Sequence, residues 1–149
     1  MAKFMRQLSV LTAVCLSASL VSCAADQRPD PRDTVKGLFT AIQASDSLFL
    51  TENIDLARAA ATLGEEFGAD TTTPTASQPQ DLLAALTGEG QLRKRWLDDQ
   101  IVLGRSTVSG DTAWVEVSFI DRLTRVQYYN KMRLEFRGSR WVINSFRTL

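Results

Sequence analysis

Two cysteines and two acidic pairs are the residues of this 149-residue chain that first suggest chemistry. Cys23 lies where an apolar stretch gives way to the polar, proline-rich segment CAADQRPDP. A thiol at such a place could form half a disulfide, bind a metal, act as a nucleophile or carry a lipid. The sequence contains no histidine, which removes the usual general base near neutral pH and the commonest metal ligand.

The first 22 residues favour the lipid. They begin with two cations, Lys3 and Arg6, and continue without charge to Ser22, a pattern typical of a secretory signal peptide. The uncharged stretch is too short and too rich in Ser and Ala for a membrane span, which needs about 20 apolar residues. The second cysteine, Cys15, lies inside this stretch after a bulky valine and would leave with residues 1–22.

Residues 20–23, Leu-Val-Ser-Cys, resemble the bacterial lipobox. The resemblance implies a diacylglyceryl group on the Cys23 thiol, cleavage after Ser22 and usually acylation of the new amino terminus. A secreted protein cleaved near Ala24 or Ala25 is the alternative. Each buried methylene contributes about 0.8 kcal/mol, so two or three chains would anchor the protein durably in a membrane.

Ala24 stands where an aspartate would retain an enteric lipoprotein at the inner membrane. We therefore expect the protein at the periplasmic face of the outer membrane of a bacterial cell envelope. Residues 23–30 form a polar tether, which at roughly 3.5 Å per residue reaches about 25 Å. Lipidated Cys23 would be the only cysteine left, so an intramolecular disulfide is excluded, and nucleic acid is an implausible partner for an exported protein.

The remaining residues, 31–149, suffice for one domain with a hydrophobic core. Their charge is uneven, because residues 23–90 carry eleven acidic and four basic side chains while residues 91–149 carry six acidic and eleven basic ones. Such an asymmetry can mark a surface for anionic partners. The alternative is that two oppositely charged halves pack together and keep ordinary solvated faces.

Helical signals come first along the chain. Asp30 as N-cap and Pro31 at the first helical position predict a helix that ends near Ala44, with an apolar stripe of Val35, Leu38, Phe39 and Ile42. A second helix is predicted over 55–67, a mobile loop over 69–80, and a short helix in DLLAALTGEG. The segment QLRKRWLDDQ, 91–100, fits either a helix or the start of a strand.

Beyond residue 98 the apolar period changes from 3.6 to 2. Strands are predicted over 99–108, 111–120, 124–137 and 140–147, with turns at Ser109-Gly110 and Gly138-Ser139. Helices followed by a four-stranded antiparallel meander define an α+β fold in which helices cover one face of a curved sheet.

Four segments of the chain resemble nuclear transport factor 2-like domains, particularly those of small bacterial lipoproteins. The first resembles the opening helix of the family and the others its last strands: PRDTVKGLFTAIQASD, SGDTAWVEVSF, YYNKMRLEF and GSRWVINSF. The resemblance implies a cone in which a bent sheet is wrapped by three helices around a cavity, with frequent dimerisation through the sheet. The family includes isomerases, dehydratases and polyketide cyclases as well as members without known catalysis. Fold alone therefore does not assign an activity.

The acidic pairs, Glu65-Glu66 and Asp98-Asp99, are interpreted as solvated charge, because adjacent residues on a regular element point in different directions. The sequence shows no glycine-rich phosphate loop, no Gly-x-Ser-x-Gly elbow and no Cys/His metal spacing. No catalytic residue, metal or cofactor is predicted.

Two groups of residues are candidates for binding. The first would line a cavity for an apolar ligand, with the Tyr128 hydroxyl orienting it, although such a stripe is more often plain core: Phe39, Val117, Phe119, Tyr128, Met132 and Trp141. The second would form an interaction face, unless it is solvated or dimer-forming: Arg125, Tyr129, Lys131 and Arg133. The favoured hypothesis is a non-catalytic, lipid-anchored domain that binds an envelope protein or an apolar ligand. The alternative is a small isomerase, dehydratase or cyclase that uses the cavity.

Overall fold

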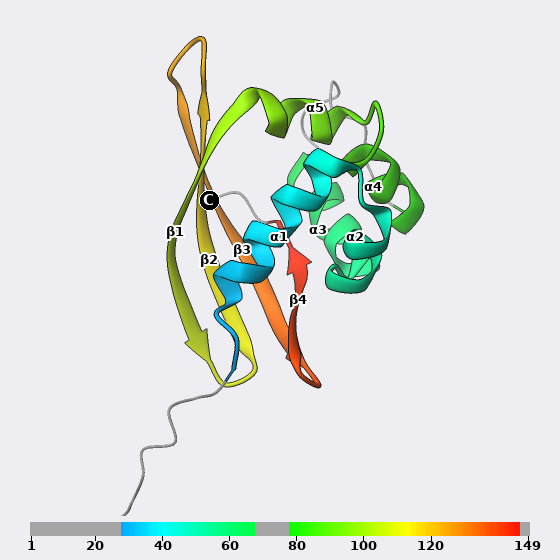
Figure 1. Cartoon of the computed structure of the whole chain (residues 1–149), viewed down its shortest axis with the longest axis vertical. Helices are drawn as coiled ribbons and strands as arrows, with labels where there is room; N and C mark the ends of the chain where they lie inside the picture. Colours follow the sequence, from blue (N-terminus) through cyan, green and yellow to red (C-terminus); the bar gives the residue numbers. More distant parts are fainter. Residues whose placement is uncertain (1–27, 68–77, 147–149) are drawn as a thin grey trace, which may run out of the picture.

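The computed structural model describes residues 28–67 and 78–146, with the side chains of residues 64–67 left aside. In these ranges five helices precede a four-stranded antiparallel sheet of order β1-β2-β3-β4 (Figure 1). The predicted α+β class and the order of its elements are confirmed. The signal peptide, Cys23 and residues 69–77 of the predicted loop lie outside the described residues.

Helix α1, Pro31–Ala44, has the bounds that the sequence predicts. The Asp30 carboxylate accepts a hydrogen bond from the Arg32 amide at 2.9 Å, and proline occupies the first turn, where no amide is needed. The helix ends at Ser45, which adopts the left-handed conformation with φ 55°. Val35, Leu38 and Ile42 are buried on its inner face.

The next segment forms two helices where one was predicted. Helix α2, Ser47–Asn53, was missed, and α3, Leu56–Phe67, follows it after a break at Ile54. Ile54 is extended and forms an isolated bridge with Ile143, while the Asp55 amide donates to the Ile143 carbonyl at 2.7 Å. A tertiary contact with a strand almost 90 residues away therefore interrupts the helix.

Helices α4, Pro79–Leu86, and α5, Gln91–Asp98, complete the helical layer. Helix α4 begins inside the segment predicted as loop, and α5 settles the open assignment of residues 91–98 as helix. A Cβ atom on Gly90 would lie 2.4 Å or less from two carbonyl oxygens of α4, so the tight α4–α5 connection requires glycine. Arg93 of α5 donates to the carbonyls of Ile42 and Gln43 and satisfies the C-terminal end of α1.

The sheet consists of β1, Asp99–Ser109, β2, Thr112–Asp121, β3, Gln127–Arg137, and β4, Arg140–Ser145. Two hairpin turns use Gly110 and Gly138 at positive φ, where glycine has no steric penalty. Strand β3 starts three residues later than predicted, because the Asp121 carboxylate accepts hydrogen bonds from the amides of Leu123 and Thr124 and stabilises a turn. Arg125, with φ 61°, lies in this turn and not on the strand face assigned to it.

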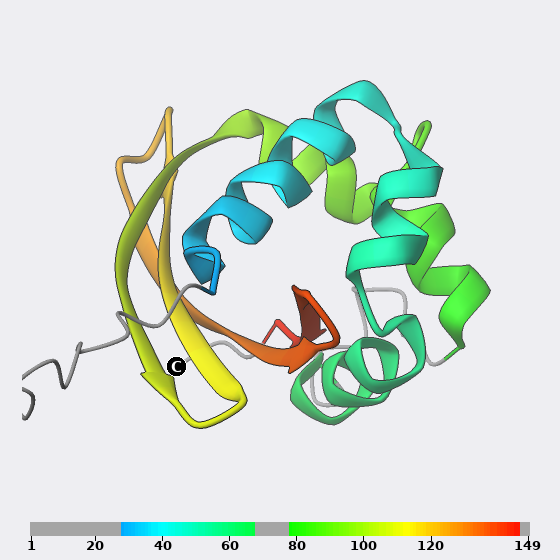
Figure 2. The ribbon, with the colours of Figure 1, turned by 60° about the horizontal axis from the view of Figure 1, so that its bottom comes forward.

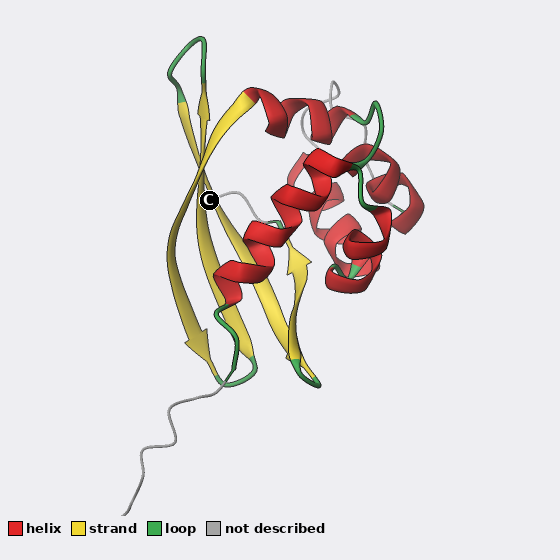
Figure 3. Ribbon diagram, viewed as in Figure 1, coloured by secondary structure: helices red, strands yellow, loops and turns green. Residues whose placement is uncertain are grey.

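The helices cover the concave face of the sheet, and α1 lies along the inside of its curve (Figures 2 and 3). The predicted alternation in β2 is confirmed, since Ala113, Val115, Val117 and Phe119 are all buried. No helix among the described residues is both long enough and apolar enough to cross a membrane. Side chains from both layers form one buried core between the sheet and the helices.

The last residues of the predicted tether lie against the sheet. Arg28 donates to the Gly110 carbonyl at 2.8 Å, pairs with the Asp111 carboxylate at 3.0 Å, and its guanidinium lies 4.7 Å from the Phe136 ring centre. The Pro29 carbonyl accepts a hydrogen bond from the indole Nε1–H of buried Trp141 at 2.7 Å. The predicted tether therefore needs correction at its end: from Arg28 onward the chain belongs to the folded domain.

Candidate ligand pocket at one end of the sheet

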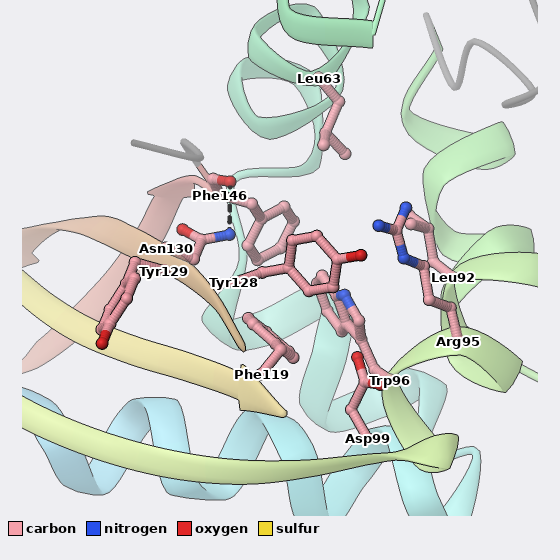
Figure 4. A pocket seen from close by; sticks show the side chains of 10 residues that line it. All are labelled: Leu63, Leu92, Arg95, Trp96, Asp99, Phe119, Tyr128, Tyr129, Asn130 and Phe146. Atoms are coloured by element: carbon pink, nitrogen blue, oxygen red, sulfur yellow. Dashed lines mark hydrogen bonds between the residues drawn. The ribbon is translucent and has the colours of Figure 1, made fainter. Parts of the chain in front are cut away.

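A pocket of about 90 Å³ lies between α3, α5 and the end of the sheet where β1 begins and β2 ends (Figure 4). Its lining comprises Leu63, Leu92, Arg95, Trp96, Asp99, Phe119, Tyr128, Tyr129, Asn130 and Phe146. At about 30 Å³ per water molecule the pocket has room for about three water-sized groups, less than the roughly 150 Å³ that accommodates benzene. A propyl-sized part of a ligand fits this space.

Aromatic rings form the pocket's inner wall. Trp96 stacks on Phe119 with ring centres 5.5 Å apart and meets Phe146 edge-on at 5.6 Å. Leu92 lies one turn before Trp96 on the same side of α5, and both are buried. Three elements thus supply a rigid apolar wall, because such ring pairs favour fixed geometries.

Polar groups form the rim. The Tyr128 hydroxyl points toward the Arg95 side of the pocket (Figure 4), and the Arg95 guanidinium carbon lies 5.9 Å from the Tyr128 ring centre. Tyr128 is 47% exposed and therefore open to solvent. The sequence-based argument had assumed a phenol buried in a closed interior. Asp99 completes the rim from the first position of β1.

Asp99 has an unusual electrostatic environment. Burial raises the pKa of its carboxyl, and the charge of Asp121, its direct partner on β2, raises it further. Main-chain hydrogen bonds from Thr124 and Leu123 lower the pKa of Asp121, which therefore holds its negative charge. Asp98 is exposed, as expected for a solvated acid, whereas Asp99 is half-buried and lines the pocket.

Asn130 is a polar residue on the apolar face of β3, and it holds Phe146 beside the pocket. Its side-chain Nδ2–H donates to the Phe146 carbonyl at 2.9 Å, which holds Phe146 against the sheet. Its Oδ1 has no hydrogen-bond partner although the residue is only 8% exposed. The amide thus positions one aromatic wall of the pocket.

The structure separates the six predicted cavity residues. Phe119 and Tyr128 line the pocket, whereas Val117, Met132 and Trp141 are buried in the core and line neither the pocket nor the groove beside it. Phe39 packs edge-on against Trp96 and Phe119, each with ring centres 5.8 Å apart. It also lines an open groove of about 350 Å³ between α1, α5 and β1, which adjoins the pocket at Trp96 and Asp99.

Sequence reasoning missed the residues that α5 contributes, namely Leu92, Arg95 and Trp96. The available signal was the apolar pair Leu92 and Trp96 at spacing four, which places both on one helical face. Leu63 lies in the helix predicted over 55–67, but nothing in the sequence placed it at the same pocket as Trp96.

The predicted interaction face lies on the other side of the sheet. Tyr129 borders the pocket, but its ring is 58% exposed and points away from it (Figure 4). The register places Glu116 opposite Lys131 and Trp114 opposite Arg133, so this face combines both charges with an aromatic ring. Dimerisation or partner binding through it stays a prediction.

Within residues 28–67 and 78–146 no three His, Cys, Asp or Glu side chains gather closely enough to hold a metal ion. At one place the acidic and basic halves of the chain pair with each other, which is the alternative to a surface for anionic partners. Asp55 of the acidic half pairs with Arg137 at 2.7 Å, and Arg58 pairs with Glu135 at 3.0 Å.

No protein-family model matches the chain, and no curated protein matches it either. A solved structure does: a designed nuclear transport factor 2-like protein, a variant of Rd1NTF2_05, superposes with a TM-score of 0.53 at 17% sequence identity. The match covers 79% of this chain and 95% of the designed one. The chain therefore has a nuclear transport factor 2-like fold, a fold that can bind ligands or support catalysis.

Proposed function

We propose that the protein is a non-catalytic binding domain, anchored to a bacterial membrane through lipidated Cys23, whose pocket takes the apolar end of a small ligand. The single observation that supports binding is the pocket itself, with aromatic walls, a polar rim and about 90 Å³ of space. Sites with an apolar lining and a few convergent polar groups are the usual place for small ligands.

Filling the pocket tests this proposal. Leu92→Phe should close the space beside Trp96 and abolish the shift of the Trp96 indole NMR signal that 1-hexanol causes in the wild-type domain. Leu97→Phe is the matched control, because Leu97 lies on the same helix but lines the groove and not the pocket. Equal hexanol binding in wild type and Leu92→Phe would contradict the pocket as the site.

The proposed anchor would also orient the domain. Arg28 is held at the β1–β2 hairpin, so Cys23 lies at most five residues, or about 18 Å, from that end of the sheet. The pocket rim lies at the opposite end of the sheet, at Asp99 of β1 and Tyr128 of β3. The hairpin end would then face the bilayer and the pocket would open away from it.

Processing and fractionation test the anchor. Wild-type protein should be found in the membrane fraction with a mature chain that starts at a lipid-modified Cys23 by mass spectrometry, and globomycin should block its maturation. Cys23→Ser should remain unlipidated and lose this processing. A mature chain that starts after a different residue and carries a free thiol would contradict the anchor.

Asp99 favours a second candidate, a small enzyme that abstracts a proton beside a carbonyl group. Its carboxyl has a raised pKa and lines the same pocket as the Tyr128 hydroxyl, so a base and a hydrogen-bond donor share one site. This candidate requires α-hydrogen exchange of small ketones in deuterated buffer faster than buffer alone, lost in Asp99→Asn and retained in Asp98→Asn. Exchange no faster than in buffer would leave the binding proposal as the better one.

A further inference from the structure

We infer that the ligand of this pocket is a small amphiphile with a short apolar tail and an oxyanion head, a carboxylate or a sulfonate, held by Arg95. This inference rests on the proposed binding function and assigns the chemistry of its ligand. It follows from the donors at the rim, from the charges around them and from the size of the inner space.

Hydrogen-bond donors converge on the rim. Among the described residues Arg95 forms no ion pair or hydrogen bond; its guanidinium carbon lies 5.9 Å from the Tyr128 ring centre, and its charge attracts the Asp99 carboxylate. The Tyr128 hydroxyl donates to no described residue, and it points toward the same space (Figure 4). Trp96 lines the same pocket, and its indole nitrogen donates to no described residue.

An oxyanion satisfies these groups better than a neutral or cationic head. A guanidinium presents a planar fork that matches two oxygens of one anion, and such charge-assisted hydrogen bonds are about twice as strong as neutral ones. A cationic head would be repelled by Arg95 at the rim, whose charge the partly protonatable Asp99 offsets only in part. A neutral alcohol would leave most of the donors to water.

Asp99 is the group that opposes an anion, and its neighbours decide how strongly. Burial disfavours its charge most, Asp121 and Asp98 repel it, and Arg95 and Arg122 attract it. The net effect raises the pKa of Asp99, so an arriving anion shifts a carboxyl that is already easier to protonate than usual. Binding of a permanently charged anion should therefore take up a proton and strengthen as the pH falls.

The length of the ligand's apolar tail follows from the size of the space between the pocket walls. Leu63, Leu92, Phe119 and Phe146 surround about 90 Å³, which accommodates about three methylene-sized groups beyond the rim. A straight chain with its head at Arg95 fits this geometry, while a ring system of several rings does not.

Three probes with one tail and different heads test the inference on the folded domain: hexane-1-sulfonate, 1-hexanol and hexylamine, of whose six carbons the inner space takes the terminal three and the rim the rest. Titration of the Trp96 indole signal should give a Kd for the sulfonate about tenfold lower than for hexanol, since one charge-assisted hydrogen bond contributes about 1.5 kcal/mol. Hexylamine should bind most weakly. The sulfonate keeps its charge at all pH values used, so a fall of its Kd with falling pH should arise only through Asp99.

Two variants locate the effect. Arg95→Gln should raise the sulfonate Kd about tenfold and leave the hexanol Kd unchanged, whereas Lys94→Gln, one residue earlier and paired with Glu89, should change neither. Asp99→Asn should tighten sulfonate binding at pH 7 and remove its pH dependence.

The outcomes separate the two proposals. Hexanol binding as tight as sulfonate binding, or an equal loss of both in Arg95→Gln, would overturn the oxyanion head and leave the pocket as an apolar site. No response of the Trp96 signal to any probe, with the domain folded, would overturn the binding function itself.

Discussion

Replacing Asp99 by asparagine should stabilise the domain at neutral pH, because this carboxylate is held where its charge is unfavourable. Asp99 and Asp121 are directly opposite each other on β1 and β2. Opposed side chains start from Cβ atoms about 5 Å apart, and two unit charges at about 6 Å repel by about 0.7 kcal/mol in water and about 2.8 kcal/mol at an effective dielectric of 20. Attraction by Arg95 and Arg122 offsets part of this repulsion. We expect a net gain of about 1 kcal/mol for Asp99→Asn, between these limits.

The sign of the pH dependence follows from the raised pKa. The folded state binds the Asp99 proton more tightly than the unfolded chain, whose aspartates titrate near pH 3.9. Stability from this group is therefore greatest below that pH and is lost as the pH rises through the folded-state pKa. The advantage of Asp99→Asn should be present at pH 7 and disappear near pH 3.5.

Urea denaturation at both pH values measures the free energy of unfolding, and at pH 7 the melting temperature should rise by about 3–5 °C. Asp98→Asn is the control, because it removes the same charge from the adjacent exposed residue, and it should change stability by less than about 0.5 kcal/mol. A similar gain in Asp98→Asn would mean that net charge and not the local environment is responsible. Absence of a gain at pH 7 would refute the reasoning about Asp99.

Two further predictions concern contacts between distant segments. Asp55→Asn keeps an N-cap oxygen for α3 but loses the 2.7 Å ion pair with Arg137, so it should cost about 0.5–1 kcal/mol at pH 7 in urea denaturation. Burial raises the pKa of Asp55, but the hydrogen bonds and charges of Arg137 and Arg58 lower it more, so this cost should vanish as the pH falls well below 4. Asp46→Asn also changes a helix cap but breaks no ion pair among the described residues, so it should cost less at pH 7. Trp141→Phe removes the donor to the Pro29 carbonyl and should cost about 1–2 kcal/mol and speed amide hydrogen exchange near residue 28, whereas Trp114→Phe, on the outer face, should leave that exchange unchanged.

Elements held by local chemistry could be predicted closely from the sequence. Asp30 and Pro31 define the start of α1 through a cap and a fixed φ, and both act within one helical turn. The strands follow from a period of two, which Ala113 to Phe119 display without interruption. Helix α2 and the break at Ile54 could not be predicted, because the bridge to Ile143 that separates α2 from α3 is a long-range contact.

The candidate site shows the same division. Phe119 and Tyr128 were expected beside a cavity because they lie on the inward face of neighbouring strands. Met132 and Trp141 share that orientation but are covered by packed side chains, since distance along the strand decides whether an inward residue meets the core or the hollow end. Arg95 and Trp96 entered the site only through α5, whose short, charged sequence is compatible with helix or strand.

By itself the sequence determined the order of helices and strands, the cap that starts α1, and the inward face of β2, because these depend on neighbours within a few residues. Only the tertiary structure decided that Asp99 joins a pocket while Asp98 stays in solvent, that Arg28 is fastened to a hairpin, and that the hollow lies at one end of the sheet. Those properties arise from burial and charge supplied by segments far apart in the chain, and no local pattern of residues records them.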